Sequence, residues 1–213
     1  MFYGDFLTTD DSGEGNSPFP KTEPSGWYYF KEIFSDIDVS RVKKYVDENL
    51  ELSKGSLAEY QEVNGGVDNS IRTSQVAWIP YNNETDWVWR KIGPMINEAN
   101  KQMWNFDLIG CVENIQYSKY FGSEDNPNFY HWHMDCSPSM NIRKISCIIQ
   151  LSDGDSYEGG NVELWDKSQH ASVFPRDKGS TFFFPSYMMH RVRPVTSGIR
   201  ESLVLWVSGP PYR

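Results

Sequence analysis

Two histidines and an aspartate alternate within the stretch NFYHWHMDCS, residues 128–137. In a β-strand, side chains two residues apart point to the same face, so His131, His133 and Asp135 would share a face. Imidazole nitrogens and carboxylate oxygens are ligands for transition metals. The pattern is weak on its own, because a histidine on a strand is more often an ordinary core or surface residue.

A third ligand is available from a later stretch, TFFFPSYMMHRVRPV, which contributes His190. Two neutral imidazoles and one carboxylate on one face of a metal leave three coordination positions open, as in non-heme Fe(II) oxygenases. Further along, four alternating residues share strand parity: Arg200, Ser202, Val204 and Trp206. A guanidinium binds a carboxylate through two hydrogen bonds, so this pattern suits the far carboxylate of an α-keto dicarboxylic acid. The competing interpretation is a surface arginine that closes the last strand.

The composition limits the classes of partner. A formal charge of −9 and a pI near 4.9 argue against nucleic acid as a partner. The N-terminal stretch lacks the features of a secretion signal, and no stretch approaches eighteen uncharged apolar residues. We therefore expect a soluble, cytoplasmic protein with no membrane partner. The odd number of cysteines predicts reduced thiols rather than disulfides.

The chain divides into a helical first half and a β-rich second half. Apolar residues recur at helical spacing within residues 35–50, with Asp38 as the expected N-cap, and again within residues 85–104. We expect the second helix in two pieces, because Gly93 and Pro94 interrupt it. We expect a single domain, 1–213, that comprises an N-terminal arm (1–26), a helical support region (27–106) and a β-core (107–213).

Short β-type runs follow residue 107, separated by turn residues: VENIQYSKYF, YHWHMD, IRKISCIIQLS, NVELW, STFFFP and ESLVLWVS. The stretch DGDSYEGGN reads as a turn between two of them. Many short strands with no helix between them indicate a sandwich, a barrel or a jelly roll.

At this level of detail the sequence resembles a family. The segment 112–208 is similar to the catalytic core of Fe(II)/2-oxoglutarate-dependent dioxygenases of the prolyl 4-hydroxylase-like branch. The matching motifs occur in order: IQYSKYFGS, YHWHMD, LSDGDSYEGGNVELW and KGSTFFFPSYMMHRVRPVTSGIRESLVLW. The resemblance implies an α+β fold, in which N-terminal helices support a double-stranded β-helix of the jelly-roll, cupin-like type.

The resemblance also implies a ligand set. His133, Asp135 and His190 would bind Fe(II), and Arg200 would hold the distal carboxylate of 2-oxoglutarate. The implied cofactors are Fe(II), 2-oxoglutarate and O₂, with ascorbate as an accessory reductant. Collagen-type relatives usually carry lysine at the place of Arg200, so the resemblance does not extend to a collagen-like substrate.

Three further positions match the family less specifically. Tyr120 would contact 2-oxoglutarate, and Tyr130 and Trp206 match aromatic positions that line the active site and would contact the substrate. Ser202 shares strand parity with Arg200, so its hydroxyl would add a hydrogen bond to 2-oxoglutarate. His131 is expected in solvent or beside the metal ligands rather than among them.

Other residues receive no chemical role from the sequence. His170 falls in an expected turn, and Gly159 and Gly160 are expected to allow a tight turn or close strand packing. The remaining aromatics are interpreted as core or helix-packing residues: Trp27, Tyr28, Tyr29, Trp78, Trp87 and Trp89.

Three functions remain open at this point. The resemblance favours hydroxylation of a peptidyl or protein proline, with release of succinate and CO₂. The alternative is a hydroxylase of a free amino acid or another small metabolite, which a closed pocket would indicate. A non-catalytic, metal-binding jelly roll is disfavoured by the combination of three ligands with Arg200. The sequence does not indicate the oligomeric state.

Overall fold

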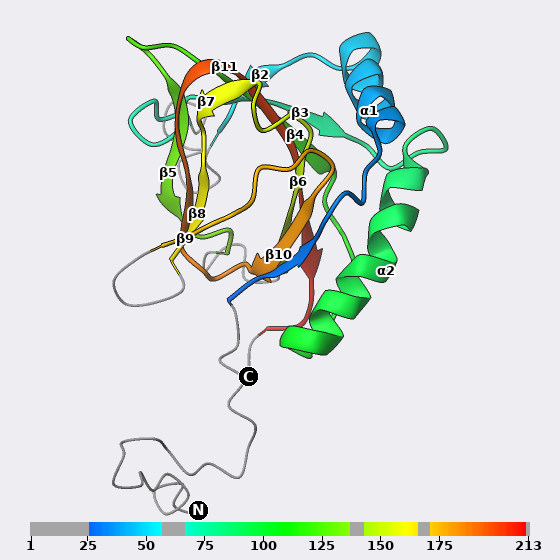
Figure 1. The fold of residues 1–213 in the computed structure, drawn as a ribbon. Coiled ribbons are helices and arrows are strands. Elements are labelled where there is room, and N and C mark those ends of the chain that lie inside the picture. Colours follow the sequence, from blue (N-terminus) through cyan, green and yellow to red (C-terminus); the bar gives the residue numbers. More distant parts are fainter. Residues whose placement is uncertain (1–25, 57–66, 137–142, 166–170, 212–213) are drawn as a thin grey trace, which may run out of the picture.

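The computed structural model describes residues 26–56, 67–136, 143–165 and 171–211. The expected N-terminal arm, 1–26, lies almost wholly outside the described residues, and His170 lies outside them as well. Within the described part, two helices pack against one side of a β-structure of two facing layers (Figure 1).

The larger layer is an antiparallel sheet. Its strands lie in the order β1 (Tyr28–Phe30), β10 (Thr181–Pro185), β6 (Arg143–Gln150), the second half of β11 (His190–Ser208), β4 (Ile115–Phe121), β3 (Gln75–Ile79) and β2 (Ser53–Lys54). The β-structure therefore includes three strands, β1 to β3, from residues 27–106, which we predicted to be a helical support region. Short edge strands such as β1 and β2 carry too little periodicity to be recognised in a sequence.

The smaller layer is built on the first half of β11. That half pairs with β5 (Asn128–His133), β7 (Tyr157–Gly159) and β8 (Val162–Leu164), and β9 (Ser172–Val173) adds to β8. Because one long strand belongs to both layers, the sheet folds over on itself as a jelly roll. This confirms the predicted α+β class with a jelly-roll core and supporting helices.

The stretch DGDSYEGGN, which we predicted to be a turn, also contains a strand. It contains β7, whose Glu158 pairs with Ser197 of β11. Gly159 and Gly160 follow with φ values of +70° and +63°. A Cβ on Gly159 would lie 2.0 Å from the Pro194 carbonyl oxygen, so close strand packing requires glycine there.

The two helices cover the outer face of the large sheet (Figure 1). Helix α1 (Asp36–Asn49) buries Val39, Val42 and Val46 against it. Its N-cap is Ser35 rather than Asp38: the Ser35 hydroxyl accepts from the Asp38 N–H, and the Asp38 carboxylate accepts from the Ser35 N–H. This reciprocal capping box makes Asp38 the third helical residue.

Helix α2 (Asp86–Met103) is one uninterrupted element, so the prediction of two pieces was wrong. Pro94 removes a single N–H donor from the helix interior. The residue before it, Gly93, has no Cβ to clash with the proline ring. Buried residues on both sides of Pro94, including Ile92 and Ile96, hold the two halves against the same sheet. Tertiary packing therefore overrides the local break.

Strand β6 shows how the large sheet positions a site. Alternate residues Ile145, Cys147 and Ile149 pack in the core beneath the helices. The intervening residues, Ser146 and Gln150 among them, face the opposite side, toward the small layer. Both faces of β6 are buried, one by helices and one by the interior of the jelly roll. A polar residue on the inner face is therefore placed inside the molecule.

The cysteines and the helices bear on two further predictions. The three cysteines carry free thiols, in agreement with the prediction of reduced residues. No helix among the described residues is long and apolar enough to cross a membrane.

Candidate active site

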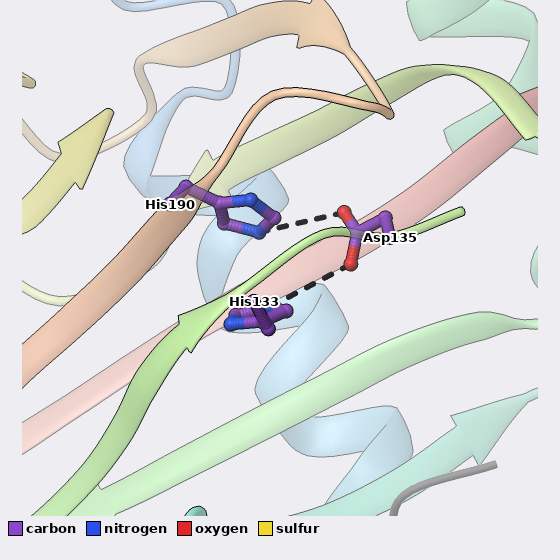
Figure 2. A group of neighbouring side chains, drawn as sticks. All are labelled: His133, Asp135 and His190. Atoms are coloured by element: carbon purple, nitrogen blue, oxygen red, sulfur yellow. Dashed lines mark ion pairs between the residues drawn. The ribbon is translucent and has the colours of Figure 1, made fainter. Parts of the chain in front are cut away.

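His133, Asp135 and His190 lie together between the two layers (Figure 2). His190 begins β11 and is the direct cross-strand partner of His133, the last residue of β5. The Asp135 carboxylate oxygens lie 3.7 Å from His133 Nε2 and 3.5 Å from His190 Nε2. One ligand atom from each residue falls within 4.8 Å of the others. This spacing and this donor set suit a single divalent metal ion.

A β-bulge decides which histidine of β5 joins this group. Tyr130 is paired with Val192 and His133 with His190, so three steps along β5 oppose two steps along β11. The extra residue reverses the parity of the strand. His133 and Tyr130 consequently face the same side and their rings stack, with centroids 3.5 Å apart. His131 is exposed and does not line the cavity, so the expectation of a shared face with His133 was wrong.

Backbone carbonyls orient both imidazoles. His133 Nδ1 lies 2.7 Å from the His131 carbonyl oxygen, and His190 Nδ1 lies 3.0 Å from the Met188 carbonyl oxygen. A carbonyl oxygen can only accept, so Nδ1 carries the proton in each ring. The Nε2 lone pair of each imidazole is left free to bind a metal.

The surroundings set the protonation states that metal binding requires. Burial lowers the pKa of His133 well below its usual value, and the neighbouring His190 lowers it further. Burial opposes ionisation of Asp135, but His190, His133 and a hydrogen bond from Ser146 outweigh it and hold the Asp135 pKa at about 2. The Ser146 hydroxyl donates to Asp135 Oδ2 over 2.6 Å. The group therefore offers an ionised carboxylate beside a neutral imidazole.

These residues open onto a cavity of about 540 Å³ between the two layers. Its lining includes all eight residues that the sequence singled out: Tyr120, Tyr130, His133, Asp135, His190, Arg200, Ser202 and Trp206. They come from β4, β5 and β11 and from the segment just after β5. Distant segments of the chain thus contribute to one concave site.

Arg200 is buried in the cavity wall with only 1% of its surface exposed. Its Nη2 donates to Gln150 Oε1 over 2.9 Å and its Nη1 to Ser202 Oγ over 3.3 Å. Among the described residues, its buried Nε has no hydrogen-bond partner and its guanidinium has no carboxylate partner. Burying an uncompensated charge is costly. An anionic ligand in the cavity would provide the missing partner.

The adjacent carboxylate does not neutralise Arg200, because it faces the other way. Glu201 lies on the outer face of β11, where it accepts from the Tyr117 hydroxyl and pairs with Lys43 and Lys119. On the inner face, the Tyr120 ring lies 5.4 Å from the guanidinium carbon. Gly160 leaves room for the arginine stem, since a Cβ there would lie 3.1 Å from Arg200 Cδ.

Trp206 packs against Arg143, which forms an ion pair that the sequence did not reveal. The Arg143 guanidinium stacks on the Trp206 ring with its carbon 3.7 Å from the centroid. Arg143 is held by a two-point contact with Glu113, and it also donates to the Asp135 carbonyl oxygen over 3.1 Å. Arg143 therefore connects Trp206 to Asp135. We refer to His133, Asp135 and His190 together as the metal group.

Two other cavity residues were missed. Trp78 was interpreted as a core residue, but it is 42% exposed and lines the cavity near Trp206, with ring centroids 6.2 Å apart. Arg72 is buried, its guanidinium carbon lies 4.6 Å above the Tyr130 ring, and its Nη2 has no hydrogen-bond partner among the described residues. Only the alternating parity of strand β3 and the isolated bridge between Arg72 and Tyr130 place them here. That bridge joins segments far apart in the sequence.

Comparison with known proteins agrees with this geometry. Residues 115–208 match the family model of the 2OG-Fe(II) oxygenase superfamily. This segment carries the whole metal group and Arg200. This match supports the predicted likeness of the β-core to the 2OG-Fe(II) oxygenase superfamily, in its prolyl 4-hydroxylase-like branch.

Curated relatives include PKHD-type hydroxylases from Synechococcus sp. (strain CC9605) and Idiomarina loihiensis. The first is 34% identical over 104 residues, which cover 48% of this chain and 45% of the relative. The second is 36% identical over 107 residues, which cover 48% of this chain and 47% of the relative. The chain thus spans about half the length of the curated relatives it matches.

Solved structures extend the likeness to most of the fold. A prolyl hydroxylase from Trichoplax adhaerens, in complex with a hypoxia inducible factor peptide, matches with a TM-score of 0.70 at 18% identity and covers 86% of this chain and 84% of its own. A Pseudomonas putida prolyl-4-hydroxylase matches with a TM-score of 0.62 at 18% identity and covers 87% of this chain and 93% of its own. The predicted prolyl hydroxylase-like, double-stranded β-helix fold is thereby confirmed.

Proposed function

We propose that this protein is an Fe(II)- and 2-oxoglutarate-dependent hydroxylase that acts on a peptidyl or protein proline. The observation that carries the proposal is the meeting of two complementary features in one cavity. A group of two imidazoles and a carboxylate could hold a metal, and a buried arginine without a counter-charge could hold a dicarboxylate. A metal site alone would not require that arginine.

The ligand assignment follows from the free atoms. His133 and His190 would bind Fe(II) through Nε2 and Asp135 through a carboxylate oxygen. Arg200 and Ser202 would bind the distal carboxylate of 2-oxoglutarate, with Tyr120 against its chain. When bound, iron and 2-oxoglutarate supply the reaction with O₂, in which the cosubstrate becomes succinate and CO₂ and one oxygen atom enters a substrate C–H bond. The protein positions the reactants and limits access of water.

A peptide substrate is favoured by the mouth of the cavity. Three apolar residues of its lining are well exposed: Trp78 (42%), Met134 (51%) and Met189 (38%). Exposed apolar side chains around a concave site are typical of surfaces that bind another chain. A site for a small metabolite would instead enclose its ligand.

Arg72 supplies a polar group that a peptide could use. Its unpartnered Nη2 is a donor at the cavity wall, and a peptide carbonyl oxygen is an acceptor. We expect Arg72→Lys to raise the KM for a peptide substrate by roughly 10-fold. Lysine lacks the Nη2 donor at that place, and one hydrogen bond is worth about 1 to 1.5 kcal/mol. The dissociation constant of 2-oxoglutarate should stay within about 2-fold of the parent value, because Arg72 lies over Tyr130 and not beside Arg200. If Arg72→Lys weakened peptide binding and 2-oxoglutarate binding equally, Arg72 would not be specific to the peptide.

Substrate class is tested by turnover under matched conditions. The Fe(II)-loaded protein would be supplied with 2-oxoglutarate and O₂, together with either a proline-containing peptide library or free amino acids. Succinate formation coupled to a mass increase of one oxygen atom in a peptide proline is the expected result. Coupled turnover with free amino acids alone would replace the proposed substrate by a small metabolite. Absence of any 2-oxoglutarate binding would reject the proposed function itself.

A further inference from the structure

The partner that holds Arg200 is a neutral amide. Gln150 ends strand β6, and Ser202 is its direct cross-strand partner on β11. Only 2% of Gln150 is exposed. Its backbone is fixed on both sides, because its N–H donates to the Ser180 carbonyl oxygen and its own carbonyl accepts from the Gly179 N–H. The side chain therefore starts from a well-defined place on the inner face of the sheet.

The orientation of the amide follows from chemistry. A guanidinium can only donate, so the atom that lies 2.9 Å from Arg200 Nη2 must be the oxygen of the Gln150 amide. The Ser202 hydroxyl, 3.3 Å from Nη1, is the second acceptor. Both acceptors are uncharged. They restrict the direction of the guanidinium but leave its full charge uncompensated.

Two arginines on the same strands as Gln150 and Arg200 differ from Arg200 because each has a carboxylate partner. Arg143 of β6 is paired with Glu113, and Arg191 of β11 is paired with Glu163. A glutamate at position 150 would be of the same size as glutamine and would give Arg200 such a partner from within the chain. A carboxylate ligand would then meet an existing ion pair, and its own charge would be left without a partner.

We propose that Gln150 is a positioning residue that makes the site selective for 2-oxo acids with a distal carboxylate. Its amide oxygen orients Arg200 for a bound carboxylate, and its lack of charge keeps the arginine available to that carboxylate. The inference rests on the proposed function, in which Arg200 binds the distal carboxylate of 2-oxoglutarate. It assigns the selectivity to a residue on a different strand from the arginine.

The test compares two ligands and three variants. Under anaerobic conditions, the dissociation constants of 2-oxoglutarate and of 2-oxopentanoate would be measured on the Fe(II)-loaded protein by the absorbance of the chelate and by calorimetry. 2-Oxopentanoate has the same chain length but no distal carboxylate. The ratio of the two constants reports on the arginine end of the site alone. The variants are Gln150→Glu, Gln150→Leu and, as a matched control, Gln116→Glu.

Gln150→Glu is expected to weaken 2-oxoglutarate by about 100-fold, as expected for loss of a hydrogen-bonded charge partner. 2-Oxopentanoate should change by no more than about 3-fold, since it makes no charged contact at that end. The preference for the dicarboxylate should therefore almost disappear. Gln150→Leu keeps the arginine unpaired but removes its acceptor, so we expect a loss of roughly 10-fold for 2-oxoglutarate alone.

Gln116→Glu controls for a general effect of negative charge. Gln116 lines the cavity, but its amide donates to Ser118 Oγ, and none of its hydrogen bonds among the described residues is to Arg200. It should reduce 2-oxoglutarate affinity far less than Gln150→Glu, by about 3-fold, because it adds a charge without forming an ion pair with Arg200. Fe(II) affinity and the circular dichroism spectrum verify that each variant is folded.

The possible failures are distinguishable. If the parent protein does not bind 2-oxoglutarate, the proposed function falls and this inference with it. If the parent binds it and Gln150→Glu retains the parental ratio of the two constants, only the role of Gln150 is overturned. Equal losses from Gln150→Glu and Gln116→Glu would also overturn it, since cavity charge alone would then explain the effect. Should Gln150→Glu fail to fold, a parental ratio in Gln150→Leu would likewise overturn the role of Gln150.

Discussion

Replacement of His133, Asp135 or His190 by alanine is expected to reduce Fe(II) affinity by more than about 100-fold, and to abolish coupled turnover. Loss of residues that merely support metal ligands already costs 10- to 100-fold, and a site with two protein ligands also loses its facial geometry. Anaerobic titration with Fe(II), followed by calorimetry, measures the affinity directly. Each variant should retain the parental circular dichroism spectrum, because the three side chains meet in a cavity and not in the apolar core.

His131→Ala is the matched control for this series. The residue is a histidine on the same strand, two positions from His133, but it is exposed and lies outside the cavity lining. The variant should bind Fe(II) within about 3-fold of the parent, as expected for a surface side chain that makes no contact with the metal group. An equal loss of affinity in His131→Ala would mean that the ligand set is wrong and that the bulge in β5 does not exclude this histidine.

Arg200→Ala is expected to separate the binding of iron from that of 2-oxoglutarate. Fe(II) affinity should stay close to the parental value, because Arg200 contacts Gln150 and Ser202 and none of the metal group. The dissociation constant of 2-oxoglutarate should rise by roughly 30- to 1000-fold, which corresponds to about 2 to 4 kcal/mol for a charge-assisted contact whose partner is left unpaired. Anaerobic absorbance of the iron chelate reports this affinity.

Two milder variants define the contribution of geometry. Arg200→Lys retains the charge but not the two-point contact, so its effect should be smaller than that of alanine. Ser202→Ala should cost about 1 kcal/mol, the value of one neutral hydrogen bond. A parental 2-oxoglutarate affinity in Arg200→Ala would show that the arginine has no part in ligand binding. The buried charge would then remain without an explanation, and the cosubstrate assignment would lose its main support.

Strand parity predicted which residues of β11 share a face, because it is a local property of the chain. Arg200, Ser202 and Trp206 were expected on one face of a strand, and all three line the cavity. The same parity sends Glu201 to the opposite face. What parity could not supply was the partner of the arginine. Gln150 is fifty residues away in the chain and meets Arg200 only because β6 and β11 are neighbours.

Local rules failed where long-range pairing changed the local geometry. Parity placed His131 and His133 on one face, but the bulge between Tyr130 and His133 separates them. A bulge arises from the register between two strands, here β5 and β11, and neither strand encodes it alone. In α2, the intrinsic cost of Pro94 was similarly outweighed by burial against the sheet on both sides.

The sequence by itself therefore determined the residue types that line the cavity and their order along the chain, and its hydrophobic periodicity limited the β-core to a sandwich, a barrel or a jelly roll. The choice of the jelly roll came from the resemblance to a known family. Only the tertiary structure explained why His133 and not His131 joins Asp135, why Arg200 keeps an uncompensated charge, and how Arg72 and Trp78 reach the same cavity. The physical reason is that these outcomes depend on strand register and on burial. Both are properties of segments that meet in space, and no local pattern of the chain records them.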